Sequence, residues 1–181
     1  AVGLVALSVS GVASADTLAK VKQSGVFTIG HRDASIPLSY YDDKQQPIGY
    51  AMDLCMKIVD AVKAELKMPN LKVNYQLVTS ANRMQAIMDG KADLECGSTT
   101  NNAERRQQVA FTIPHYITGA RILVRANAKF DKINDFEHKK LAITKGTTVL
   151  KAVQHANEER LLYIDIVEAP SHAAAVEMLD K

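Results

Sequence analysis

The sequence predicts an α/β protein built from two successive sets of parallel strands and helices. Three observations support this prediction. Short apolar segments recur between turn residues, segments with apolar residues at helical spacing separate them, and the pattern starts anew near residue 120. Such alternation is typical of a largely parallel sheet with right-handed crossovers, whose ligand crevice lies at the carboxyl ends of the strands.

The first set of elements follows the order βαβαβ. A short polar helix is expected at 17–23, strands at 26–30, 71–77 and 92–96, and helices at 51–66 and 80–89. Ser80 is expected to cap the second of the longer helices, and Asp89-Gly90 to end it. Prolines and aspartates between the first strand and the next helix predict a loop that contains Tyr40 and Tyr41.

The second set begins after an extended stretch at 116–118. Strands are expected at 121–124, 141–144 and 163–167, with helices from Thr147 and from near Pro170. The last helix reaches Lys181 without a cap. We therefore expect a first lobe over residues 16–117 and an incomplete second lobe over residues 118–181.

Composition narrows the class of protein. The 181 residues are 47% hydrophobic and 23% charged, which is typical of an ordinary globular chain. The formal charge is only +2, and the basic residues are dispersed. Because a phosphate backbone needs a concentrated basic stripe, nucleic acid is not an expected partner.

The first fifteen residues form an uncharged apolar run that ends in Ala13-Ser14-Ala15. This pattern precedes signal-peptidase cleavage, so we expect a partial signal peptide at 1–15, a mature chain that begins at Asp16, and a periplasmic location. A buried helix or a membrane anchor is the alternative, but the run is shorter than the roughly 20 residues that span a bilayer. The absence of Cys at the cleavage point argues against a lipid anchor.

Cys55 and Cys96 are the only cysteines. An oxidising compartment permits a disulfide between them if the fold brings them together. Both occupy apolar positions of expected elements, where free Cys packs as a small hydrophobic residue. We therefore favour two thiols, although the sequence leaves both states open.

The segment 97–106 is crowded with hydrogen-bond donors from two Asn amides, three hydroxyls and two guanidiniums. A carboxylate removed from water needs several charge-assisted hydrogen bonds, and Arg supplies them as a bidentate fork. The segment therefore predicts a polar binding site, with a solvated turn and an N-capped helix as the alternative.

GSTTNNAERR followed by VAFTIPHYITGARILV resembles the signature of periplasmic polar amino-acid-binding proteins of ABC importers, especially the glutamate/aspartate-binding members. GHRDASIPLSYYDDKQQPIGYAMDL, VTSANR and KKLAITKGTT fit in order, so the resemblance covers nearly all of residues 17–181. It implies a type II periplasmic-binding-protein fold with two lobes that close on the ligand by a hinge. It also implies a monomer without a cofactor that delivers L-glutamate or L-aspartate to a membrane permease.

The resemblance also implies site residues. Arg105 would hold the α-carboxylate, and Ser98 and Thr100 would contact the backbone end of the amino acid. The positions that match the site for the distal carboxylate are Arg32, Ser80, Arg83 and His172. Thr147 and Thr148, at a helix start that favours anions, would also meet the α-carboxylate. The contact to the ammonium group would come from beyond Lys181, so we expect this chain alone to bind poorly.

Elementary electrostatics supports the same site. An enclosed glutamate carries two carboxylates, and the desolvation of each costs several kcal/mol unless a cation pairs with it. Arg32 follows an expected strand and Arg83 begins the next helix, so both should reach one crevice. Taken singly, each would be interpreted as a surface arginine.

Two other function classes remain open. The five histidines lack metal-ligand spacing, and neither a nucleophilic Cys context nor a Gly-rich phosphate loop occurs, so we expect no enzyme. Glu95 in a buried strand could nevertheless be the general acid of a dehydratase-like enzyme, or a structural partner of a neighbouring Arg. A ligand-sensing domain is the third possibility. The choice between glutamate and aspartate depends on one methylene, worth only about 1 kcal/mol.

Overall fold

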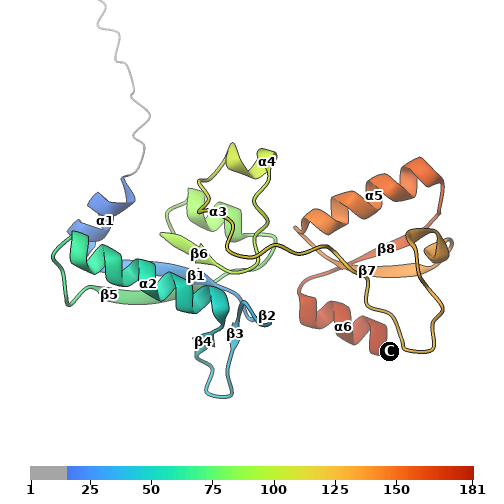
Figure 1. Cartoon of the computed structure of the whole chain (residues 1–181), viewed down its shortest axis with the longest axis horizontal. Coiled ribbons are helices and arrows are strands. Elements are labelled where there is room, and N and C mark those ends of the chain that lie inside the picture. The colour runs from blue at the N-terminus through green and yellow to red at the C-terminus, as the bar shows by residue number, and fades with distance from the viewer. Residues whose placement is uncertain (1–15) are drawn as a thin grey trace, which may run out of the picture.

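The computed structural model describes residues 16–181, and the signal peptide expected at 1–15 lies outside the described residues. The helices are α1 (Thr17–Ser24), α2 (Tyr50–Glu65), α3 (Arg83–Met88), α4 (Ala103–Arg106), the 3-10 helix η1 (Ile133–Phe136), α5 (Thr148–Arg160) and α6 (His172–Asp180). The strands are β1 (Val26–His31), β2 (Ala34–Ser35), β3 (Ser39–Tyr41), β4 (Pro47–Ile48), β5 (Lys72–Leu77), β6 (Leu94–Cys96), β7 (Lys140–Thr144) and β8 (Asp165–Ala169). Figure 1 shows two groups of elements side by side.

The first group is built on a three-stranded sheet in the order β5-β1-β6. β1 pairs in parallel with both neighbours, which confirms the expected βαβαβ order. The central strand is the most apolar, and Phe27 and Ile29 are buried against Met52 and Val59 of α2. Because the strands run in parallel, β1 and β6 end at the same edge, and the residues that follow them lie close together.

The loop expected between β1 and α2 is instead a small antiparallel sheet in the order β2-β3-β4. Ser35 pairs with Ser39, and Tyr40 pairs with Ile48. Strands of two or three residues are too short to show alternation of apolar and polar side chains, so sequence periodicity missed them. Ser39 is fully buried, and its hydroxyl accepts a hydrogen bond from the Arg32 backbone N–H at 2.9 Å, which positions the end of β1.

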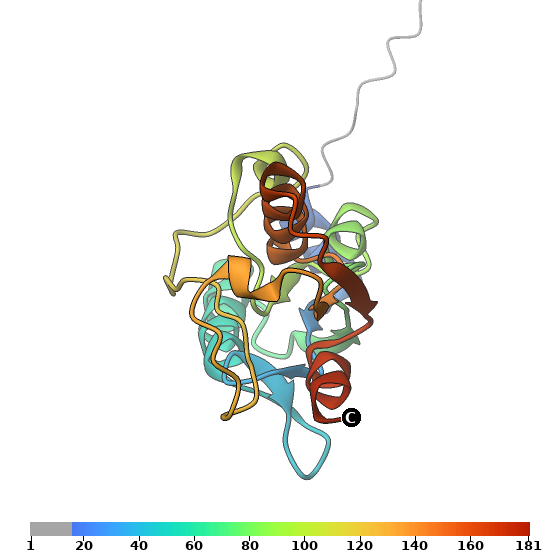
Figure 2. The same ribbon diagram turned by 90° about the vertical axis from the view of Figure 1, so that its right-hand side faces the viewer.

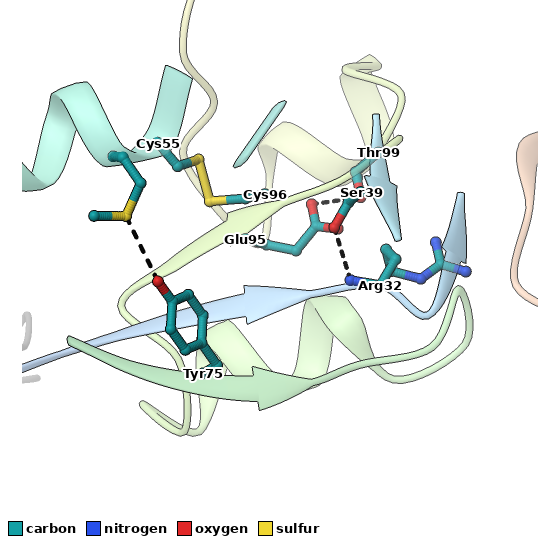
Figure 3. Close-up of a disulfide and its surroundings, with 8 residues drawn as sticks. Arg32, Ser39, Cys55, Tyr75, Glu95, Cys96 and Thr99 are labelled. Atoms are coloured by element: carbon teal, nitrogen blue, oxygen red, sulfur yellow. Dashed lines mark hydrogen bonds between the residues drawn. A yellow bond between two sulfur atoms is a disulfide. The ribbon is translucent and has the colours of Figure 1, made fainter. Parts of the chain in front are cut away.

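Cys55 and Cys96 form a disulfide, so the expectation of two thiols is wrong (Figure 3). Helix α2 packs on β6 and brings the two Cα atoms to 6.3 Å, within the usual range for a disulfide. The bridge lies in the first core, with Cys96 1% exposed. It ties α2 to the strand from which the donor-rich segment 97–106 departs.

The second group has its own core around β7 and β8, which pair in parallel. Helices α5 and α6 lie on opposite sides of this strand pair (Figures 1 and 2). Leu141 and Ile143 of β7 pack against Leu150 and Val153 of α5. The expected strand at 163–167 is therefore present, shifted by two residues to Asp165–Ala169.

The strand expected at 121–124 is not formed in the described part of the chain. Ile122 and Val124 pack on the second core, as their apolar character predicts, but within residues 16–181 no neighbouring strand pairs with them. Arg125 instead donates hydrogen bonds to the carbonyls of Leu179 and Asp180 at the end of α6. An apolar segment with a buried face thus remains irregular because its backbone lacks a partner strand.

The segment 107–132 carries the chain from the first group to the second without helix or strand (Figure 1). Side chains also join the groups, since Lys151 of α5 contacts the Glu104 carboxylate at 2.6 Å. Among the helices in residues 16–181, none combines the length and apolarity needed to cross a membrane.

Candidate functional site

Two buried arginines lie where the first sheet ends. Arg32 directly follows β1 and is 1% exposed, and Arg83 is the first residue of α3 and is 3% exposed. The Nε and one terminal nitrogen of each guanidinium are buried without a hydrogen-bond partner among residues 16–181. Because buried donors are normally satisfied, these four nitrogens mark a place prepared for an acceptor.

Ser80, which the resemblance groups with Arg32 and Arg83, is buried like these two arginines. Its side chain is 3% exposed, and its hydroxyl has no partner in the described part of the chain. Asn82, and not Ser80, occupies the N-cap position of α3, so the expected capping role is wrong. The Ser80 hydroxyl is buried and makes no hydrogen bond to the first N–H groups of α3.

Arg105 approaches from the loop after β6. Helix α4 is held by Asn102, whose side chain accepts a hydrogen bond from the Arg105 N–H at 2.9 Å. The Arg105 guanidinium donates to the Thr100 carbonyl at 3.0 Å and to the Gly146 carbonyl at 3.2 Å, so it spans the two groups of elements. Ser98 on the same loop is half-buried and Thr100 is exposed.

The second group contributes two helix starts. Thr147 occupies the N-cap position of α5, but its hydroxyl donates to the Thr144 carbonyl at 2.8 Å and does not cap the helix, and Thr148 is the first helical residue. His172 begins α6, and its Nδ1 lies 2.9 Å from the Thr144 hydroxyl.

Gly146 lies close to the first group. A methyl group added there would come within 2.6 Å of the Ser80 carbonyl oxygen and of the Ala81 Cα, and the backbone φ of +75° also favours glycine. The two groups therefore meet without space for a side chain at this position.

The charges of the site act on one another. Burial, opposed by the charge of Glu95 and assisted by the charges of Arg32 and Arg105, lowers the pKa of Arg83 to about 10. Burial also lowers the pKa of His172, and the charges of Arg32 and Arg83 lower it further, so the neutral imidazole is favoured. The charges of the three arginines therefore act on one another, and their convergence on one ligand stays a prediction.

Glu95 differs from its expected role as the direct partner of an arginine. Its carboxylate accepts a hydrogen bond from the Thr99 hydroxyl at 2.7 Å, and within residues 16–181 it forms no ion pair. The sequence holds no signal for this contact beyond the spacing of four residues between Glu95 and Thr99. Glu95, Arg83 and Thr99 line a common cavity of about 170 Å³.

In the part of the chain that the structure describes, no group of three or more His, Cys, Asp and Glu side chains is placed to hold a metal ion. The buried polar groups that lack partners there are mostly donors, namely guanidinium nitrogens and hydroxyls. This arrangement is suited to an anionic guest.

Comparisons with known proteins agree with this geometry. Residues 27–164 match the model of the bacterial extracellular solute-binding proteins, family 3. The chain is 42% identical to the L-glutamate/L-aspartate-binding protein of Pseudomonas aeruginosa, over 91% of this chain and 55% of that protein. It is 36% identical to the glutamate/aspartate import solute-binding protein of Escherichia coli, over 99% of this chain and 63% of that protein. The chain thus spans little more than half the length of these relatives.

The fold has a counterpart among solved structures. The ancestral amino acid-binding protein AncCDT-1, described as a precursor of cyclohexadienyl dehydratase, superposes with a TM-score of 0.75 at 27% identity. The match covers 91% of this chain and 69% of the ancestral protein. The expected α/β fold of a periplasmic amino-acid-binding protein is therefore confirmed.

Proposed function

The chain belongs to the bacterial extracellular solute-binding proteins of family 3, and from this premise we propose that its protein captures L-glutamate or L-aspartate outside the cytoplasmic membrane. The captured amino acid passes to the permease of an ABC importer. Residues 16–117 and 118–181 act as the two lobes of the binding protein, which is a periplasmic monomer and needs no cofactor.

The observation that carries this proposal is the pair of buried guanidiniums at Arg32 and Arg83, which have free donors within residues 16–181. An unpaired buried charge is costly, and a protein keeps it only where another group compensates for it. A side-chain carboxylate of the guest would accept hydrogen bonds from both arginines and from the free Ser80 hydroxyl. The same carboxylate would lie near His172, which is half-buried beside Thr144.

The α-carboxylate of the guest binds at the part of the site that would serve any amino acid. Arg105 already reaches from one group of elements to the other, and it borders both the 98–100 loop and the start of α5. Ser98, Thr100, Thr147 and Thr148 supply further hydroxyl and backbone donors around it. A guest held between these segments would draw the lobes together, because each lobe contributes part of the shell.

A non-catalytic role is the simplest assignment for this arrangement. The relatives that match most of the chain are named as binding proteins, and a dehydratase enters only through the ancestral precursor. Glu95 donates no proton in this proposal, and its carboxylate is engaged by Thr99. Comparing turnover of carboxylated rings by the parent and by Glu95→Gln tests the enzymatic alternative.

Calorimetric titration of the full-length mature protein with L-glutamate, L-aspartate and L-glutamine tests the proposal. Tight binding of an acidic amino acid, with much weaker binding of glutamine, is expected. Arg105→Ala should weaken all three ligands, whereas Arg106→Ala is the matched control, since Arg106 is exposed and its guanidinium donates to the Asn101 side chain. Preference for glutamine, or no binding of either acidic amino acid, would reject the proposal.

A further inference from the structure

Glu95 is a charged group that the proposed function leaves without a role. It lies in β6, where it pairs with Gly30 of β1. One carboxylate oxygen accepts the Thr99 hydroxyl at 2.7 Å, and the other is buried without a hydrogen-bond partner among residues 16–181. Figure 3 shows the carboxylate turned toward the end of β1, from which Arg32 departs. A buried, half-satisfied carboxylate is expensive unless a positive charge compensates for it.

The space around Gly97 shows how close the aliphatic part of the Arg32 side chain lies to the Glu95 carboxylate. A methyl group built on Gly97 would come within 2.5 Å of the free Glu95 oxygen and within 2.9 Å of Cγ of Arg32. The carboxylate and the Arg32 side chain therefore meet over the bare backbone of Gly97. Arg83 lines the same cavity as Glu95.

Glu95 is also the one carboxylate in residues 16–181 whose charge acts on all three arginines. It opposes the pKa-lowering effect of burial at Arg32, Arg83 and Arg105. Among these three arginines, Asp33 raises the pKa of Arg32 alone, and Glu104 raises the pKa of Arg105 alone.

We propose that Glu95 is the resident counter-ion of the arginine cluster and thereby sets the charge of the guest that the cleft selects. Glu95 compensates for part of the positive charge of the three guanidiniums and leaves the rest to the carboxylates of an amino dicarboxylate. This inference rests on the proposed function, in which the cluster binds the carboxylates of the guest.

The counter-ion has two consequences. In the ligand-free protein it reduces repulsion among the buried guanidiniums of Arg32 and Arg83 and the partly exposed guanidinium of Arg105. In the binding reaction it lowers the attraction of the cleft for guests of high negative charge, because each added charge on the guest meets the carboxylate as well as the guanidiniums. Glu95 thereby reduces the electrostatic advantage that a plain dicarboxylate of charge about −2 would have over a zwitterionic amino dicarboxylate of net charge about −1.

Glu95→Gln in the full-length protein removes the charge and retains an amide oxygen that can accept the Thr99 hydroxyl. Glu65→Gln is the matched control, because Glu65 is an exposed residue at the end of α2 in the same group of elements. We expect E95Q to lower the melting temperature of the ligand-free protein more than E65Q does. We also expect glutarate affinity to rise about tenfold, glutamate affinity about threefold, and glutamine affinity not at all, in proportion to guest charge.

An equal change in affinity for glutarate, glutamate and glutamine would overturn the inference, because Glu95 would then act only on the shape of the site. If E95Q does not fold, the double variant E95Q/R83M is compared with R83M alone, since R83M removes one of the positive charges that Glu95 would compensate. A folded double variant with a melting temperature close to that of R83M supports the counter-ion, and a double variant that still does not fold overturns it. If the parent protein itself does not bind glutamate, the proposed function fails, while the melting comparison still tests Glu95.

Discussion

Replacing Arg83 by methionine should stabilise the ligand-free protein and remove most of its affinity for acidic amino acids. Arg83 is 3% exposed, and two of its guanidinium nitrogens have no partner among residues 16–181. Burial lowers the pKa of this group from the ordinary arginine value to about 10, so its charged form is less favourable in the folded than in the unfolded protein. At about 1.4 kcal/mol for each tenfold change in the dissociation constant, the difference is about 3 kcal/mol.

The sign of this difference follows from linkage. Below pH 10 the guanidinium is charged in both states, so the full penalty opposes folding at neutral pH, and it fades only as the pH rises above about 10 toward the ordinary pKa of arginine. Methionine keeps much of the side-chain volume without the charge, and part of the gain is lost to imperfect packing. We expect a net gain of about 1–3 kcal/mol in the free energy of unfolding of the ligand-free protein.

The effect on binding has the opposite sign. A guest carboxylate that loses one buried cationic partner should bind about 2–5 kcal/mol more weakly, which is at least about a 30-fold loss of affinity. Urea unfolding without ligand and calorimetric titration with glutamate, both on the full-length protein, measure the two effects. An R83M variant that is less stable than the parent and still binds glutamate with parental affinity would refute the reasoning.

Three further predictions concern the framework of the site. Reduction of the disulfide between Cys55 and Cys96, which lie 41 positions apart, should lower the free energy of unfolding by about 4 kcal/mol in urea titrations with and without reductant; equal midpoints would contradict this. Gly146→Ala should weaken glutamate binding in calorimetric titration, because the added Cβ would lie 2.6 Å from the facing backbone. Gly25→Ala is its control, since Gly25 has a similar φ of +68° but open space around it, and an equal loss of affinity in both variants would contradict the steric argument. Burial lowers the pKa of His172, so protonation of this side chain favours the unfolded protein. The stability of the protein should therefore fall as the pH drops below 6.5. Thermal melts from pH 7.5 to about 5 should show a smaller fall in melting temperature for His172→Asn than for the parent protein.

Much of the molecule was predictable from the order of its residues. The alternation of apolar strands and amphipathic helices predicted the parallel sheet of the first group and the β7–β8 pair, because strand and helix periodicity depend on neighbours along the chain. The positions of Arg32 and Arg83 at element ends followed from the same pattern. The carboxyl ends of parallel strands share one edge, so convergence of these side chains could be anticipated.

The tertiary structure decided the features that depend on contacts between distant residues. The packing of α2 on β6 joined Cys55 to Cys96, although their apolar settings favoured thiols. The lack of a partner strand within the described chain left 121–124 irregular, although its composition favoured a strand.

The electrostatic character of the site also came from packing. Burial left donors of Arg32, Arg83 and Ser80 without partners in residues 16–181, and packing over the bare Gly97 placed the Glu95 carboxylate near the aliphatic part of Arg32. Residue type and spacing indicate which side chains lie at an edge of the sheet. Only close packing in three dimensions determines which of them lose their water and which charges they then face.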